Sequence, residues 1–207
     1  MSKTITRLFD DYADAKTAVT QLESAGIPRD DISVVANNTH GDHAADDHDG
    51  VNDHGDVTRG VSTGAALGGA GGLLAGLGLL AIPGLGPIVA AGWLAATAVG
   101  AGIGAAGGAA TGGIVGALKN AGHSDEEANV YSEGVRRGGT LVSARVDDAE
   151  VASVEAILDG NRSVTADRRG EAYRQSGWTQ FNPDAEAYTA DEIARDRAAY
   201  RTPTSTF

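Results

Sequence analysis

Hydrophobic positions in the first 38 residues follow a strand, helix, strand pattern. Ile5 to Phe9 has the pattern of an extended segment. Apolar residues then recur every three or four positions, which predicts a helix through Tyr12, Ala15, Val19 and Leu22. Gly26 and Pro28 stand where a helix is expected to end. Ile32 to Ala36 supplies a second strand, so this part of the chain is a βαβ unit.

A matching pattern returns in the second half of the chain. Ser124 and Glu127 have the spacing of a capping box that begins a helix. A strand at Leu141 to Val146, a helix over residues 151–158 and a short strand around Val164 follow. The two halves together predict an α+β fold, a ferredoxin-like βαβ...αβαβ sandwich whose central hairpin strands are separated by a long insertion.

The insertion divides the chain into five predicted parts. We place them at 1–38 (first half of the ferredoxin-like domain), 39–57 (a loop rich in His and Asp), 58–119 (a glycine-zipper helical hairpin), 122–170 (second half of the domain) and 171–207 (a polar C-terminal tail). The tail carries isolated aromatic residues and a possible short helix capped by Thr189 and Glu192. We expect it to dock loosely or stay mobile, with anchoring to a neighbouring subunit as the alternative.

The hairpin is predicted from a long stretch without charge. No Asp, Glu, Lys or Arg lies between Arg59 and Lys119, which is enough for two helices of the ~20 residues that cross a bilayer. Proline lacks the amide donor that a helix needs, so helix is expected to break in the middle of this stretch. The predicted hairpin turn consists of Pro83, Gly84, Gly86 and Pro87.

Glycine recurs every fourth residue on both sides of that turn. The first series is Gly60, Gly64, Gly68, Gly72 and Gly76, and the second is Gly100, Gly104, Gly108, Gly112 and Gly116. On a helix this spacing forms one ridge without side chains, against which another backbone can pack closely. The series therefore predict helix packing and a homo-oligomer.

The surroundings of the hairpin favour a bilayer. Apolar side chains on the opposite faces are Leu73, Leu77, Leu80, Val89, Leu94, Val99 and Ile103, and Trp93 suits an interfacial position near the tip. Arg59 and Lys119 flank the open end, as expected when both ends face the cytoplasm. The prediction is a hairpin in the bacterial inner membrane with a cytoplasmic soluble domain. The alternative is a cytoplasmic protein whose hairpin packs helices inside an oligomer, since Gly and Ala make each arm only marginally hydrophobic.

Composition limits the kinds of partner that we expect this chain to bind. The net charge is −12, which opposes binding to nucleic acid because phosphate backbones attract Lys and Arg. The chain has no cysteine, which suits a reducing compartment. The first eleven residues are polar and lack the apolar core of a secretory signal.

One segment could bind a metal. The loop from His40 to Asp56 contains six aspartates, no Lys or Arg, and four of the five histidines: His40, His43, His48 and His54. Imidazole and carboxylate are ligands for divalent transition metals, but the spacing fits no fixed pattern. The simpler interpretation is a solvated acidic loop, so no cofactor is predicted beyond a weak possibility of such a metal.

Catalysis is not predicted. Gly102, Gly104 and Gly107 match the dinucleotide fingerprint GxGxxG, but they lie inside the glycine series and not at the turn of a βαβ unit. The sequence identifies no nucleophile beside a base, no pair of catalytic carboxylates and no metal-binding triad. We therefore predict no catalytic residues and no enzymatic activity.

Three phrases of the sequence resemble a known family. They are TITRLFDDY at residues 4–12, GIP at 26–28 followed by DISVVA at 31–36, and YSEGVRRGGTLV at 131–142. With the glycine-rich hairpin they resemble the general stress protein 17M-like (YflT-type) proteins of bacteria, over roughly residues 3 to 170. The resemblance implies stress-associated expression and a membrane hairpin, without an assigned reaction, cofactor or catalytic residue.

The sequence thus predicts a non-enzymatic, stress-associated membrane protein that self-associates through its glycine-zipper hairpin. The alternative is a soluble self-assembling particle, or a metal-binding module, in which the hairpin is the inner packing element.

Overall fold

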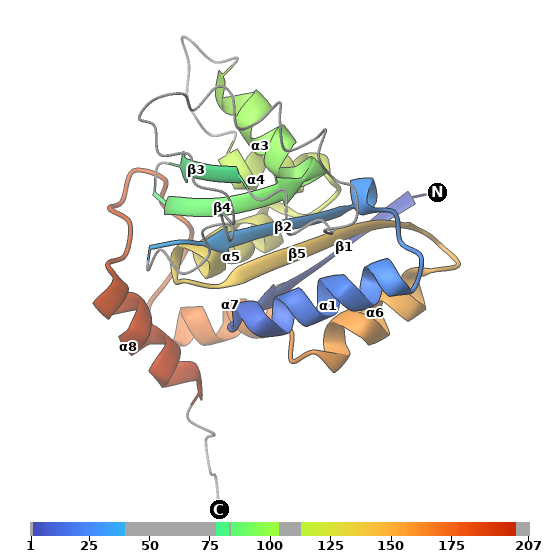
Figure 1. Cartoon of the computed structure of the whole chain (residues 1–207). Helices are drawn as coiled ribbons and strands as arrows, with labels where there is room; N and C mark the ends of the chain where they lie inside the picture. Colours follow the sequence, from blue (N-terminus) through green and yellow to red (C-terminus); the bar gives the residue numbers. More distant parts are fainter. Residues whose placement is uncertain (1, 40–77, 83, 104–112, 202–207) are drawn as a thin grey trace, which may run out of the picture.

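The fold is built on one antiparallel sheet (Figure 1). A computed structural model describes residues 2–39, 78–82, 84–103 and 113–201. The strands are β1 (Ser2–Phe9), β2 (Ile32–Asn37), β3 (Gly78–Ile82), β4 (Gly86–Gly92) and β5 (Thr140–Asp147), in the order β1-β5-β2-β4-β3. Beyond β1, Leu8 and Val164 form an antiparallel bridge, with N···O distances of 3.0 and 2.7 Å. The predicted α+β class is confirmed.

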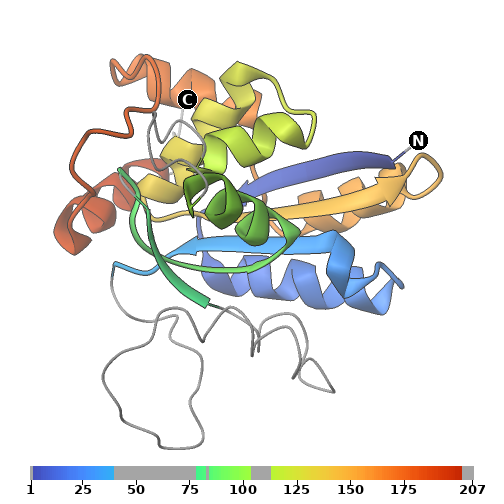
Figure 2. The same ribbon diagram turned by 90° about the horizontal axis from the view of Figure 1, so that it is seen from above.

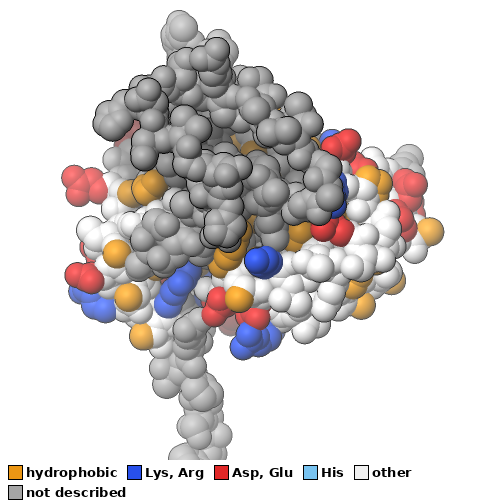
Figure 3. All heavy atoms as spheres, in the orientation of Figure 1, with side chains coloured by type: hydrophobic (Ala, Val, Ile, Leu, Met, Phe, Trp, Pro, Cys, Tyr) orange, Lys and Arg blue, Asp and Glu red, His pale blue; other side chains and the backbone are white. Residues whose placement is uncertain are grey.

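Two helices cover one face of the sheet. They are α1 (Tyr12–Ser24) and α6 (Val151–Gly160), and the side chains beneath them form a buried core that includes Phe9, Leu22, Val142 and Leu158. Asp11 begins α1, because its carboxylate accepts a hydrogen bond from the Ala13 amide at 3.2 Å. Where these helices meet solvent, Figure 3 shows hydrophobic side chains lying singly among charged ones. Such scattered residues are normal for a solvated surface.

The other face carries the helices of the second core (Figure 2). They are α3 (Trp93–Ile103), α4 (Gly113–Asn120), α5 (Asp125–Arg136) and α7 (Ala166–Gln175). The predicted capping box begins α5: Ser124 Oγ accepts from the Glu127 amide, and the Glu127 carboxylate accepts from the Ser124 amide. The core on this side joins Leu8, Val35 and Leu141 of the sheet to the helices.

The described part of the glycine-rich insertion differs from the predicted helical hairpin. Residues 78–82 and 86–92 are strands, and β4 pairs with β2 from Ser33 opposite Gly92 to Asn37 opposite Ile88. The prediction of helix here is wrong because β2 offers an unpaired backbone edge, and strand pairing satisfies the amides that a membrane helix would have satisfied internally. The rest of the described insertion forms α3 and α4, which pack against each other.

The described helices are too short or too polar to cross a bilayer. α3 has 11 residues and α4 has 8. The first predicted arm, with Gly60, Gly64, Gly68, Gly72 and Gly76, lies outside the described residues, as do Gly104, Gly108 and Gly112. The membrane prediction therefore gains no support from the described part of the chain.

The C-terminal tail packs onto the domain. It contains α8 (Ala190–Arg201), which begins at the predicted cap: the Glu192 carboxylate accepts from Thr189 N and Thr189 Oγ1, both at 2.8 Å. Ile193 is fully buried and Phe181 is 8% exposed. These two residues are core residues, so the expectation of a loosely docked tail is wrong for this segment.

Candidate functional site

The residues singled out by sequence do not gather at one site in the described structure. Gly100 lies in α3 and Gly116 in α4, whereas the other glycines of the two series are outside the described residues. The four histidines proposed as metal ligands, His40, His43, His48 and His54, are also outside them. Within the described ranges, no group of three or more metal-ligating side chains is found. The metal and zipper assignments therefore stay predictions.

The predicted hairpin turn joins two strands and not two helices. Gly84 and Gly86 have φ of +76° and +80°, a backbone conformation that favours glycine. Pro83 is outside the described residues, and Pro87 lies in β4. A Cβ built on Gly84 would lie 2.7 Å from the carbonyl oxygen of Pro183. The turn thus lets the tail approach β3 and β4 closely.

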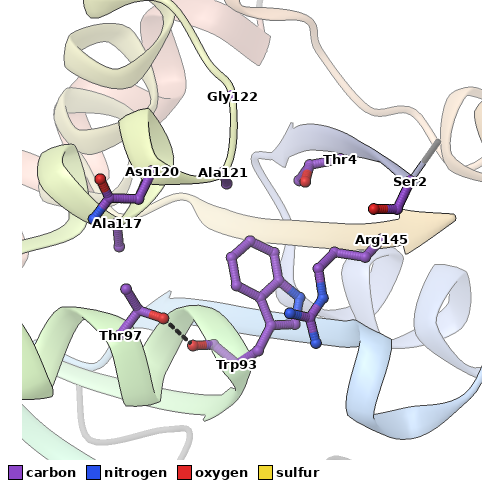
Figure 4. Close-up of a pocket in the computed structure, with 9 residues that line it drawn as sticks. All are labelled: Ser2, Thr4, Trp93, Thr97, Ala117, Asn120, Ala121, Gly122 and Arg145. Atoms are coloured by element: carbon purple, nitrogen blue, oxygen red, sulfur yellow. Dashed lines mark hydrogen bonds between the residues drawn. The ribbon is translucent and has the colours of Figure 1, made fainter.

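A pocket of about 400 Å³ opens at the other end of the sheet. Figure 4 shows side chains from α3, from the end of α4 and from the β1–β5 pair around it. The described residues that line it are Ser2, Thr4, Trp93, Thr97, Ala117, Asn120, Ala121, Gly122 and Arg145. Its size and its mixed polar and aromatic lining make it a candidate for a small-molecule site.

Trp93 and Arg145 are held in place by the turn before β2. The turn is η1 (Arg29–Asp31), and the indole Nε1 of Trp93 donates to the Asp31 carbonyl at 3.2 Å. The guanidinium carbon of Arg145 lies 4.8 Å from the centre of the Trp93 ring, a cation–π contact. Its Nη2 donates to the Asp30 carbonyl at 3.0 Å and lies 3.2 Å from Asp31 Oδ1. Both side chains are therefore positioned by contacts within the protein.

A row of hydroxyl groups crosses the same face of the sheet next to the pocket. Thr6, Ser143 and Ser33 are direct cross-strand neighbours on β1, β5 and β2, and all three are buried. Thr6 Oγ1 donates to Ser143 Oγ at 2.9 Å, and Ser33 Oγ donates to the Ala91 carbonyl at 2.8 Å. The row is satisfied internally, so its role is structural.

His123 ends this hydroxyl row. Its Nε2 is 2.8 Å from Thr6 Oγ1, and its Nδ1 is 3.8 Å from Glu127. The ring meets Tyr131 edge to face, with centroids 5.8 Å apart. Because Thr6 donates to Ser143, we assign His123 Nε2 as the donor to Thr6. Burial lowers the pKa of His123, against the opposing effect of Glu127.

The lowered pKa of His123 predicts a loss of stability in mild acid. The folded chain resists the proton that the unfolded chain accepts below a pKa of about 6.5. Hence the free energy of unfolding falls as the pH drops from about 6.5, the pKa of the unfolded chain, to the lower pKa of His123 in the folded chain. Above about pH 6.5 this contribution to stability is complete. We expect His123→Gln to remove this part of the pH dependence. Urea unfolding of both proteins between about pH 5 and 7.5 measures it, and identical pH profiles would contradict the assignment.

A second cluster lies under the C-terminal tail. The Glu133 side chain is only 1% exposed and lies between two arginines, 2.7 Å from Arg137 Nε and 3.5 Å from Arg136 Nη1. Arg137 Nη1 also reaches Asp196 of α8 at 3.0 Å. The Tyr188 ring lies 4.7 Å from the Arg136 guanidinium. The tail is therefore held by a buried network of ions and an aromatic ring.

The pKa values of Arg137 and Asp196 in this cluster shift in the directions that their surroundings predict. Burial opposes the charged form of Arg137, but the hydrogen bond and charge of Glu133 outweigh it and raise its pKa. Burial raises the pKa of the Asp196 carboxyl, against the opposing charge of Arg137. Arg137 is thus the fixed cation that links α5 to α8.

The sequence does not point to Arg145, His123 or Glu133. Glu133 lies at an interior position of a helix whose neighbours are buried, so a charge at an expected core position is the signal that could have marked it. Arg145 lies at an exposed position of β5, where a charge is ordinary. Trp93, for which the sequence predicts an interfacial position, contacts Arg145 and Asp31.

Comparison with protein-family models, with curated proteins and with solved structures finds no match to this chain.

Proposed function

We propose that this protein is a non-enzymatic, self-associating protein in which the glycine-rich insertion is a packing element inside protein. It combines an α+β domain with helix-packing glycine series, and we place it in the cytoplasm, in keeping with a chain that has no cysteine. The stress association implied by the resemblance to the general stress protein 17M-like family is part of the proposal.

The proposal is supported by where the described insertion buries its apolar residues. Leu85, Ile88, Leu94, Ile114 and Leu118 are each at most 2% exposed and share a core with Leu8, Val35 and Leu141. Side chains that face lipid lie on the outside of a protein, in contact with acyl chains. These side chains instead contact the sheet and α5, so the described part of the insertion is stabilised by protein contacts.

We further propose that the domain is ferredoxin-like. Val164, β1, β5 and β2 lie side by side in that order, which is the order that a βαββαβ sandwich requires. The fourth strand is reduced to the bridge at Val164, and β4 and β3 extend the sheet beyond β2. Among the described strands, β3 pairs only with β4, so its outer edge is a second place where another copy could add.

The experiment measures assembly and membrane binding together. Full-length protein in detergent-free buffer is analysed by light scattering after size exclusion, and by flotation with liposomes followed by a carbonate wash. We expect a homo-oligomer that does not float. Gly68→Leu with Gly108→Leu places bulky side chains on both ridges and is expected to reduce the oligomer to a smaller species.

Gly160→Leu is the matched control. A Cβ at Gly160 meets no atom within 4 Å, so this glycine-to-leucine change should leave the oligomer intact. A wild type that floats and resists the carbonate wash would favour the membrane hairpin. A wild type that stays monomeric at micromolar concentration would contradict the proposed self-association.

A further inference from the structure

The pocket beside Trp93 has one charged side chain among its described lining residues. It is Arg145, and no carboxylate is among those nine residues. Its Nη2 makes both contacts with the Asp30 carbonyl and Asp31, while Nε and Nη1 take no part in these contacts. Asp31 is 38% exposed, and ion pairs at such positions contribute little. Nη1 of the guanidinium is therefore the group that can pair with a ligand carboxylate.

The end of α4 does not cancel this positive charge. The carbonyl end of a helix carries partial negative charge and would repel an anion. Here the Ala117, Leu118 and Lys119 carbonyls already accept hydrogen bonds from the amides of residues 121–123, at 3.0–3.1 Å. Gly122 makes this closing turn possible with a φ of +99°. Arg145 is therefore the cation among the described lining residues that can attract an anion.

The rest of the lining is neutral and rich in hydrogen-bonding groups. Ser2 and Thr4 contribute hydroxyls, and Asn120 contributes a carboxamide that can both donate and accept. Thr97 Oγ1 donates to the Trp93 carbonyl at 2.8 Å, which leaves its oxygen as an acceptor. The Trp93 indole adds an apolar surface for a carbon skeleton (Figure 4). A volume of about 400 Å³ is at the lower end of the usual range for small-molecule sites.

We propose that this pocket binds a small hydroxylated carboxylate. The carboxylate pairs with Nη1 of Arg145, the hydroxyls bond to Ser2, Thr4 and Asn120, and the carbon chain lies against Trp93. Charge-assisted pairing with a guanidinium gives the site its preference for an anion. This binding does not depend on the proposed self-association, because none of these residues belongs to the glycine ridges.

The test follows the emission of Trp93. The chain has two tryptophans, so Trp178→Phe leaves Trp93 as the only one. Gluconate is the probe, with sorbitol as its uncharged counterpart and hexanoate as its counterpart without hydroxyls. We expect saturable binding of gluconate, with sorbitol and hexanoate at least about tenfold weaker. Calorimetry on the wild type repeats the titration without the tryptophan change.

Arg145→Gln is expected to weaken gluconate binding about tenfold, the effect of losing one charge-assisted contact. Arg174→Gln is its matched control: Arg174 is 47% exposed, against 42% for Arg145, and pairs with an exposed carboxylate. It should bind gluconate like the wild type. The proposal is overturned if gluconate does not saturate, if sorbitol or hexanoate binds equally well, or if both arginine variants lose the same affinity.

Discussion

Replacing Gly92 with alanine is expected to lower the free energy of unfolding by about 3–5 kcal/mol. Gly92 has a φ of +86°, where a residue with a side chain is strained. Its added Cβ would also lie 2.2 Å from the Ile32 carbonyl oxygen and 2.8 Å from Ser33 Cα, both backbone atoms that cannot turn away. Urea unfolding followed by circular dichroism measures the loss.

Gly26→Ala separates the two causes of the Gly92 effect. Gly26 has a similar φ of +92°, but a Cβ there meets nothing within 4 Å. It should therefore cost only about 1 kcal/mol, the strain of the backbone alone. Equal losses in the two variants would mean that close contact with β2 contributes nothing.

The consequence of Gly92 extends to the pocket. Gly92 ends β4 against Ser33, and the next residue, Trp93, begins α3. The close approach of β4 to β2 is what brings the indole within reach of the Asp31 carbonyl and Arg145. A shifted backbone at Gly92 should therefore also change Trp93 emission.

Sequence predicted the parts of the fold that local interactions determine. The strand periodicity of β1, β2 and β5 and the helical periodicity of α1 and α5 depend on near neighbours in sequence. The same holds for the cap at Ser124 with Glu127, whose hydrogen bonds span three residues.

The insertion could not be predicted in the same way. Residues 78–92 are apolar and glycine-rich, so they suit a membrane helix or a buried strand equally well by composition. The deciding factor is the free edge of β2, more than 40 residues earlier, which pairs with β4. Gly84, Gly86 and Gly92 adopt positive φ and allow close contacts with neighbouring segments. None of these three glycines belongs to the four-residue series.

The candidate sites are non-local for the same reason. The pocket joins residues 2–4, 93–97, 117–122 and 145, which no spacing rule connects. His123 meets Thr6 across 117 residues of sequence, and Arg137 meets Asp196 across 59. Only the assembled sheet and helices bring these groups together.

Glu133→Gln is expected to cost about 3–5 kcal/mol of stability, because it leaves two largely buried arginines without their shared countercharge. The Glu133 side chain is 1% exposed, and the Arg136 and Arg137 side chains are 12% and 10% exposed. Water cannot replace the lost carboxylate charge at such a position, so the penalty falls on the folded state. Urea unfolding measures the total loss, and hydrogen exchange over residues 190–198 reports on the tail itself.

Glu126→Gln on the same helix is the control for this change. Glu126 is 68% exposed and pairs with Arg174 at 2.7 Å, so its loss should cost at most about 1 kcal/mol. Arg137 bridges Glu133 and Asp196, and Glu133→Gln should therefore also speed exchange in α8, whereas Glu126→Gln should not. If Glu133→Gln destabilised no more than its control, the ion network would be an incidental contact. The apolar contacts of Ile193, which lies against Gly138, would then hold the tail by themselves.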